Sequence, residues 1–252
     1  MEQPPRTYKL LIAYDGTLYG GWQIQPNAPT IQEKVQEALK IILRSAVTVI
    51  GSGRTDAGVH AEGQVAHFRT ALTLDLGKVR HSLNSLLPRD IRIKSIEEAP
   101  AHFHAQYSAV GKVYHYHLFL GPVQDPFTRL YALHIREKLA LDKMRTAIPF
   151  FIGIHDFTSF SNEAHAGSAA KDPVRTLHRL DWIQQGDNIR LEFEGDGFLY
   201  KMVRNIVGTL LEVGSGKIKA TDIPLIFDQK DRRSAGKAAA PHGLFLWKVH
   251  YV

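Results

Sequence analysis

The two halves of this chain carry the same order of predicted elements, namely strand, helix, strand, strand, helix, strand. In the first half, two segments place apolar side chains at helical spacing, and the segments around them are β-branched or alternate between apolar and polar residues. The predicted strands of this half lie at 8–14, 47–50, 64–69 and 91–93, and its helices at 31–43 and 76–86. This order favours a sheet covered by two helices.

The second half repeats the order with longer connections. Its predicted strands lie at 113–120, 175–183, 189–194 and 244–251, and its helices at 141–152 and 199–213. Pro149 lacks a backbone N–H, so we expect it to kink the first of these helices.

Two βαββαβ halves predict an α+β fold. We expect two ferredoxin-like units whose antiparallel sheets meet at a central RNA-binding cleft, because this topology is shared with RNA-recognition sheets. The expected domains are 1–105 and 106–252, with the boundary inside 99–111.

Composition narrows the function classes. The 252 residues contain no cysteine, which excludes disulfides, thiol nucleophiles and thiolate metal sites. No apolar run reaches the roughly 20 residues that span a bilayer, and residues 1–5 do not resemble a signal peptide, so we expect a soluble, cytoplasmic protein without membrane contact. The net charge of +6 suits a polyanionic partner such as nucleic acid.

Residues 51–61 hold three glycines, an arginine and a carboxylate between two predicted strands. Glycine permits tight turns and close backbone approach, so this loop is predicted to present Asp56 beside Arg54. The neighbouring cation favours the ionised carboxylate. A solvated turn pair is the alternative, but a loop held between two strands has the rigid support that a chemical site needs.

The predicted helix at 199–213 places Arg204 at the edge of its apolar face. A partly buried guanidinium needs an acidic partner, and Asp56 is the candidate. The alternative is an arginine whose charged end reaches solvent along the side of the helix.

In the predicted strand at 113–120, Tyr114 and Tyr116 share one face and His115 and His117 share the other. A tyrosine that projects from a sheet can stack on a base exposed from RNA, although a core tyrosine is the commoner case. The histidines form no recognised metal pattern, so no metal is expected.

The irregular segment 153–173 is either a binding flap or a surface loop anchored by Phe157 and Phe160. No Ser/His/Asp order or phosphate-binding loop is present, so use of a nucleotide cofactor such as ATP is not expected.

Several spaced motifs then carry a resemblance to a known family, the TruA-type tRNA pseudouridine synthases. The matching segments span almost the whole chain and occur in the family's order: 14–17, 21–23, 53–61, 63–65, 84–88, 103–105, 112–116, 202–208 and 242–244. The run Gly-Arg-Thr-Asp-Ala-Gly-Val-His at 53–60 is the most specific of them.

The resemblance implies an isomerase that converts uridine to pseudouridine at positions 38, 39 and 40 of the tRNA anticodon stem-loop, without a cofactor and as a homodimer. It implies that Asp56 is the catalytic carboxylate, that Arg204 pairs with it, and that Tyr114 stacks on the target base and is a candidate for removing the C5 proton. Arg54 is implied to hold or replace the extruded nucleotide.

Two positions depart from the family pattern. Gln106 stands where an arginine is expected, and Ala240 where a proline is expected. The loss of one cation puts one RNA-backbone contact in question.

Two other classes of function remain open at this point. A non-catalytic RNA-binding module fits the charge and the paired βαββαβ units, but it gives no reason for a carboxylate in a cationic channel. A metal-dependent hydrolase would use His102, His104, His115 and His117, and chelators would inhibit it.

Overall fold

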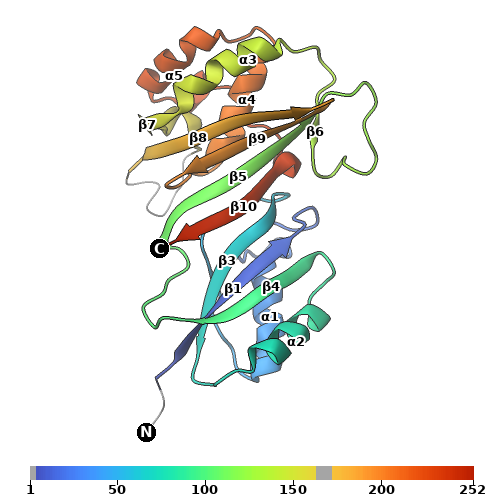
Figure 1. Ribbon diagram of the computed structural model, residues 1–252, viewed down its shortest axis with the longest axis vertical. Coiled ribbons are helices and arrows are strands. Elements are labelled where there is room, and N and C mark those ends of the chain that lie inside the picture. The colour runs from blue at the N-terminus through green and yellow to red at the C-terminus, as the bar shows by residue number, and fades with distance from the viewer. Residues whose placement is uncertain (1–3, 163–171) are drawn as a thin grey trace. The chain divides into compact units, whose positions relative to one another are not determined.

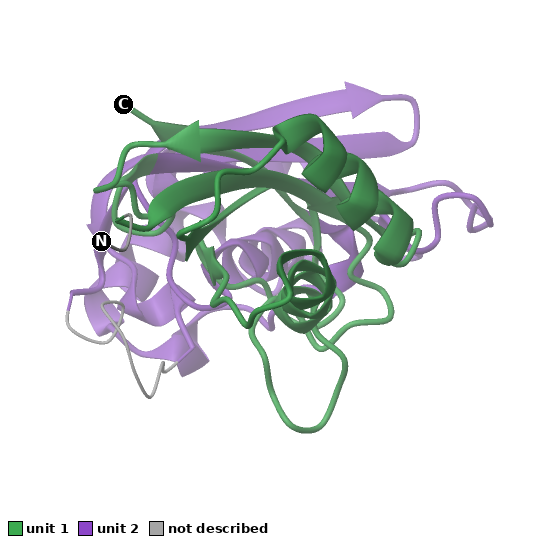
Figure 2. Cartoon of the chain, turned by 90° about the horizontal axis from the view of Figure 1, so that it is seen from below, with its two compact units in different colours: residues 1–110, 245–252 green, residues 111–244 purple. Residues whose placement is uncertain are grey.

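The computed structural model describes residues 4–162 and 172–252. By compactness the chain divides into unit 1, with residues 1–110 and 245–252, and unit 2, with residues 111–244 (Figure 2). The expected domains were 1–105 and 106–252. The compact units differ from them chiefly in the last strand, which groups with unit 1 because it pairs there with an N-terminal strand.

Unit 1 follows the predicted order of strands and helices (Figure 1). Its strands are β1 (Arg6–Tyr14), β2 (Ile50–Gly51), β3 (His60–Thr70) and β4 (Ile91–Ala99), joined by β10 (Leu244–Tyr251). Its helices are α1 (Ile31–Leu43) and α2 (Leu76–Leu86).

The sheet of unit 1 has the order β4-β1-β3-β10. Strand β1 is antiparallel to both β3 and β4, and β2 pairs antiparallel with the far end of β3. Strand β10 runs parallel to β3, with Phe245 opposite His60 and Leu246 opposite Ala61. The beginning of β3, next to the Asp56 loop, is therefore held by the last strand of the chain.

The core of unit 1 lies between this sheet and its two helices. Helix α2 packs on β4 and on α1. Alternate residues of β1 are buried, as are the side chains of α1 that recur at helical spacing. The most deeply buried of them are Leu10, Ile12, Ile31, Val35 and Leu39.

Unit 2 is also a sheet with helices. Its strands are β5 (Ala109–Phe119), β6 (Leu133–His134), β7 (Gly153–Asp156), β8 (Val174–Gln185) and β9 (Asn188–Gly195). Strands β5, β9, β8 and β7 pair antiparallel in that order, and β6 lies parallel to β5. The helices are α3 (Leu141–Ala147), α4 (Met202–Gly214) and α5 (Ile223–Gln229).

Short 3₁₀ turns fill several connections of unit 2. They lie at Ile148–Phe151, Thr158–Phe160, Ala220–Asp222, Arg232–Ser234 and Pro241–Gly243. The first shows the expected effect of Pro149, since α3 ends at Ala147 and the chain continues as a tighter turn.

The expected irregular segment 153–173 is partly ordered. Its first residues form β7 and a 3₁₀ turn, and Phe157 and Phe160 are fully buried against Phe151 and Phe227. In the described part of this segment the phenylalanines are therefore anchors, as the surface-loop interpretation requires. Residues 163–171 lie outside the described residues.

Within residues 4–162 and 172–252, every helix is too short or too polar to cross a lipid bilayer.

Candidate active site

Asp56 lies in the loop that joins β2 to β3. Its side chain is half-buried and that of Arg54 is exposed, whereas Thr55 between them is buried. The loop turns back on itself where the Val59 amide donates to the Asp56 carbonyl at 3.1 Å, and Gly58 adopts φ +75°. A positive φ is accessible to glycine without strain, so Gly58 allows this turn directly after the carboxylate.

The segment after β1 packs against the Asp56 loop through its backbone. The Trp22 amide donates to the Thr55 carbonyl at 3.1 Å, and the Gly58 amide donates to the Tyr19 carbonyl at 3.3 Å. Two glycines make this approach possible. A Cβ at Gly16 would lie 2.0 Å from the Val59 carbonyl oxygen, and one at Gly21 would lie 2.3 Å from the Thr55 carbonyl oxygen.

A buried glutamine fixes the start of the loop. The Ser52 hydroxyl donates to Gln64 Oε1 at 2.7 Å, and Gln64 Nε2 donates to the Gly53 carbonyl at 3.0 Å. Ser52 and Gln64 are both fully buried. Buried polar groups that satisfy one another rigidify their surroundings, so Gly53 is held before the chain reaches Asp56.

The end of the loop is held by His60. His60 Nδ1 accepts from the Gly16 amide at 3.1 Å and lies 3.1 Å from Asp15 Oδ1. The imidazole ring stacks on Phe245 at 4.6 Å between ring centroids. The loop is thus tied at both ends within unit 1.

Tyr114 lies in unit 2, on β5, where its ring packs edge-on against Phe198 at 4.9 Å. Tyr116 shares its face of the strand and is fully buried, and its hydroxyl donates to the Ala240 carbonyl at 2.7 Å. Burial raises the pKa of Tyr116. Ala240, one of the two departures from the family pattern, therefore supplies a backbone acceptor.

Arg204 lies in the first turn of α4 and is half-buried, as its position on the helical wheel predicts. Its Nε donates to the Ala239 carbonyl at 2.8 Å. Helix α4 begins at Met202, three residues later than expected, after Lys201 with φ +59°. Asp56 and Arg54 belong to unit 1 and Tyr114 and Arg204 to unit 2, so the pairing of Asp56 with Arg204 stays a prediction.

Sequence reasoning did not single out Lys112, which shares the face of β5 with Tyr114. Burial, with a smaller effect of the nearby Arg175 guanidinium, lowers the pKa of Lys112 to about 8. The alternation of the strand was the signal that could have identified it, since Lys112 lies two residues before Tyr114.

The histidines do not assemble into a metal site in the part of the chain that the structure describes, where no group of three or more His, Asp or Glu side chains could hold an ion. His104 Nδ1 instead accepts from the amides of Gln106 and Tyr107, both at 3.2 Å.

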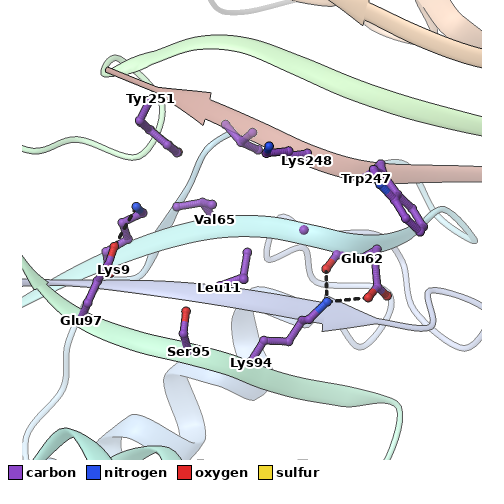
Figure 3. Close-up of a pocket in the computed structure, with 12 residues that line it drawn as sticks. Lys9, Leu11, Glu62, Val65, Lys94, Ser95, Glu97, Trp247, Lys248 and Tyr251 are labelled. Carbon is purple, nitrogen blue, oxygen red and sulfur yellow. Dashed lines mark hydrogen bonds and ion pairs between the residues drawn. The ribbon is translucent and has the colours of Figure 1, made fainter.

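A hollow of about 360 Å³ lies on the sheet of unit 1 (Figure 3), and Asp56 is not among the residues that line it. Two of its lysines are ion-paired, Lys9 with Glu97 at 2.8 Å and Lys94 with Glu62 at 2.5 Å. These pairs neutralise two of the three lysine charges that line the hollow.

Comparisons with known proteins identify the family of this chain. Residues 10–108 and 147–252 match the family model described as tRNA pseudouridine synthase. A protein of Protochlamydia amoebophila, named tRNA pseudouridine synthase A 1, is 60% identical over 97% of this chain and 96% of its own length. The tRNA pseudouridine synthase A of Bacillus subtilis is 44% identical over 96% of this chain and 98% of its own length.

Among solved structures, the match to a chain of an archaeal box H/ACA sRNP Nop10-Cbf5 complex covers 81% of this chain and 43% of that chain, at 13% sequence identity. The TM-score of this match, 0.37, is too low to indicate a shared fold. The sequence matches define the class of protein as an RNA-modifying isomerase. The chain belongs to the tRNA pseudouridine synthase family, as its motifs indicated.

Proposed function

We propose that this protein converts uridine to pseudouridine at positions 38, 39 and 40 of the tRNA anticodon stem-loop, with Asp56 as the catalytic carboxylate and without a cofactor. The observation that carries the proposal is the Asp56 loop. Its start, its turn and its end are fixed by hydrogen bonds within unit 1, and a half-buried carboxylate lies at its centre. A catalytic side chain must be held in one position, and these hydrogen bonds hold the backbone that carries Asp56.

The reaction needs no external reagent. The N1–C1′ bond of the uridine breaks, the uracil turns, C5 bonds to C1′, and the C5 proton is lost while N1 regains a proton. A carboxylate can attack the ribose, attack the base or remove a ribose proton, and each route requires the ionised form of Asp56.

The proposal assigns a role to each of the other site residues. Arg204 pairs with Asp56, and its half-buried guanidinium favours a carboxylate partner. Tyr114 stacks on the target base and accepts the C5 proton after the turn. Arg54 is exposed at the loop and holds or replaces the extruded nucleotide.

The proposal also includes the arrangement of the two halves and the association of two copies of the chain. Two ferredoxin-like halves would meet at an RNA-binding cleft, and two copies of the chain would act as a cytoplasmic homodimer on tRNA. The βαββαβ order of unit 1 and the net charge of +6 support this arrangement.

The test is tritium release from tRNA that carries 5-tritiated uridine, in EDTA and without nucleotides. We expect release by the wild type and none by Asp56→Asn, with tRNA binding retained within about tenfold, because the substitution keeps the shape and removes the charge. Transcripts that carry cytidine in turn at positions 38, 39 and 40 then assign the modified sites. Tritium release by the Asp56→Asn protein would refute the role of Asp56.

The same assay separates the other classes of function. A non-catalytic RNA-binding module would bind tRNA and release no tritium in either form. A metal-dependent hydrolase would lose its activity in EDTA.

A further inference from the structure

The residue before Asp56 is fixed at two points. Tyr14 ends β1, and its hydroxyl shares a buried hydrogen bond of 2.8 Å with Thr55 Oγ1. Only 4% of Tyr14 and 7% of Thr55 are exposed. On the backbone side, the Thr55 carbonyl accepts from the Trp22 amide at 3.1 Å.

The pairing of β1 with β3 is irregular beside Tyr14. Ile12 pairs with Gln64, but Tyr14 pairs with Ala61, so β3 gains one residue relative to β1 at this point. Such bulges redirect side chains and occur beside active sites. The Tyr14 ring then packs at a tilt against Trp22, with 6.2 Å between ring centroids.

The hydrogen bond between the Tyr14 hydroxyl and Thr55 is costly to break. Burial raises the pKa of Tyr14, so its hydroxyl stays protonated and hydrogen-bonded to the Thr55 side chain. Gln64 separately holds Ser52 and Gly53, so hydrogen bonds reach the loop on both sides of Arg54. Separating such buried polar partners is costly, since water cannot replace the lost bond.

We propose that Tyr14 is a positioning residue for Asp56, because its hydroxyl fixes Thr55 and through Thr55 the backbone that carries the carboxylate. This inference rests on the proposed function of Asp56 and adds a residue that does not touch the substrate. A displacement of about 1 Å at a reacting group can cost about a hundredfold in rate, so loss of this bond acts on the chemical step.

The experiment compares Tyr14→Phe with Tyr8→Phe under single-turnover conditions. Tyr8 lies on the same strand, is 1% exposed and also hydrogen-bonds through its hydroxyl, which donates to the Leu72 carbonyl at 3.0 Å and accepts from the Leu74 amide at 3.2 Å. Both variants remove one buried hydroxyl from β1, but only Tyr14→Phe removes a contact with the Asp56 loop.

We expect the two variants to lower the unfolding midpoint to a similar extent. Tyr14→Phe should slow tritium release about tenfold to a hundredfold with tRNA affinity nearly unchanged, and Tyr8→Phe should stay within about twofold of the wild type. Thr55→Val should reproduce the Tyr14→Phe effect, Thr55→Ser should restore the rate, and the double variant Tyr14→Phe with Thr55→Val should lose no more than either single variant.

If Tyr14→Phe fails to fold, the rate of tritium release by Thr55→Val alone tests the inference. Equal rates for Tyr14→Phe and Tyr8→Phe, or additive losses in the double variant, would overturn the inference. Asp56→Asn is assayed in the same series. If Asp56→Asn is inactive while Tyr14→Phe behaves like Tyr8→Phe, only the positioning role fails, whereas an active Asp56→Asn removes the proposed function itself.

Discussion

Tyr114 and Tyr116 lie two residues apart on one face of β5 and differ in the roles proposed for them. The Tyr116 hydroxyl donates to the Ala240 carbonyl and belongs to the folded core. The Tyr114 ring packs edge-on against Phe198, and the proposed function assigns its hydroxyl to proton transfer. Under the proposed function, the pair therefore offers a catalytic tyrosine and a structural tyrosine in equivalent backbone positions.

We predict that Tyr114→Phe binds tRNA with unchanged affinity and releases tritium at least about a hundredfold more slowly, because the ring is kept and the proton acceptor is lost. Tyr116→Phe, the matched control, should be destabilised by about 1 kcal/mol and remain active. Tritium-release kinetics and urea unfolding measure the two effects. A fully active Tyr114→Phe would restrict Tyr114 to stacking.

At the scale of elements, the approach of the 15–22 segment to the Asp56 loop depends on glycine. Gly21 has φ +98°, and a Cβ there would meet the Thr55 carbonyl. Gly186 has φ +58° in the turn between β8 and β9, and among the described residues no heavy atom outside its immediate chain neighbours lies within 4 Å of its Cβ position. A Cβ at Gly186 would therefore add backbone strain alone, whereas a Cβ at Gly21 would add both backbone strain and a steric collision.

Gly21→Ala should therefore be more damaging than Gly186→Ala. Gly186→Ala adds only the strain of a positive φ, about 1 kcal/mol. Gly21→Ala must also push the Thr55 backbone away, so it should lower both the unfolding midpoint and the rate of tritium release. Equal stability and rate in the two variants would show that the segment does not clamp the loop.

His67 on β3 ties the 100–108 segment to the sheet. Its Nδ1 accepts from the Ala105 amide at 3.1 Å. Burial lowers the pKa of His67 to about 4, with further contributions from His104 and Arg69. Since this pKa lies below the ordinary value of about 6.5, the native state favours the neutral imidazole, and protonation favours unfolding.

The stability that His67 contributes should thus be complete above about pH 6.5 and decline as the pH falls toward 4. In His67→Asn, the Asn Oδ1 can take the place of Nδ1 as acceptor and does not titrate. Urea unfolding of both proteins from pH 7 to pH 4 should show the wild type losing more stability than the variant. Other groups, including His115, titrate in both proteins and cancel in the comparison. Parallel curves would contradict this account.

The sequence predicted the elements whose stabilising contacts are local. Helices α1 and α2 were expected at their observed positions because their apolar spacing reports one buried face. Helix α5, the short strands β6 and β7 and the early start of β3 were missed. Strand pairing depends on partners distant in the chain, as for β6 with β5 and β10 with β3.

For the candidate site, too, the sequence predicted only what local patterns indicate. Glycine spacing and helical periodicity drew attention to Asp56 and predicted a half-buried Arg204. The residues that hold the loop could not be assigned this way, because Tyr14 and Thr55 are separated by 41 positions and meet only after β1 and β3 have paired.

At the scale of the whole molecule, β10 belongs to unit 1 although unit 2 precedes it in the chain. Leu246 of β10 is 1% exposed and lies opposite Ala61, whereas the next residue, Trp247, is 43% exposed. One strand therefore offers a buried and an exposed position side by side.

Leu246→Ala should destabilise the protein by about 2–5 kcal/mol and accelerate amide exchange in β3, because it leaves a cavity beside the strand that follows the Asp56 loop. Trp247→Ala should leave β3 exchange nearly unchanged. Hydrogen exchange followed by mass spectrometry of peptides from 60–70 measures both. Unchanged protection of β3 in Leu246→Ala would mean that β10 does not stabilise this part of unit 1.

The discontinuity of unit 1 also orders events during translation. The ribosome releases all of residues 111–244 before it releases the strand that pairs beside His60, so β3 must wait for its parallel neighbour while unit 2 emerges. Phe245, the ring that stacks on His60 at the end of the Asp56 loop, arrives at the same late moment. A nascent chain that stalls before residue 245 would thus carry the complete Gly-Arg-Thr-Asp motif in a loop without its final support.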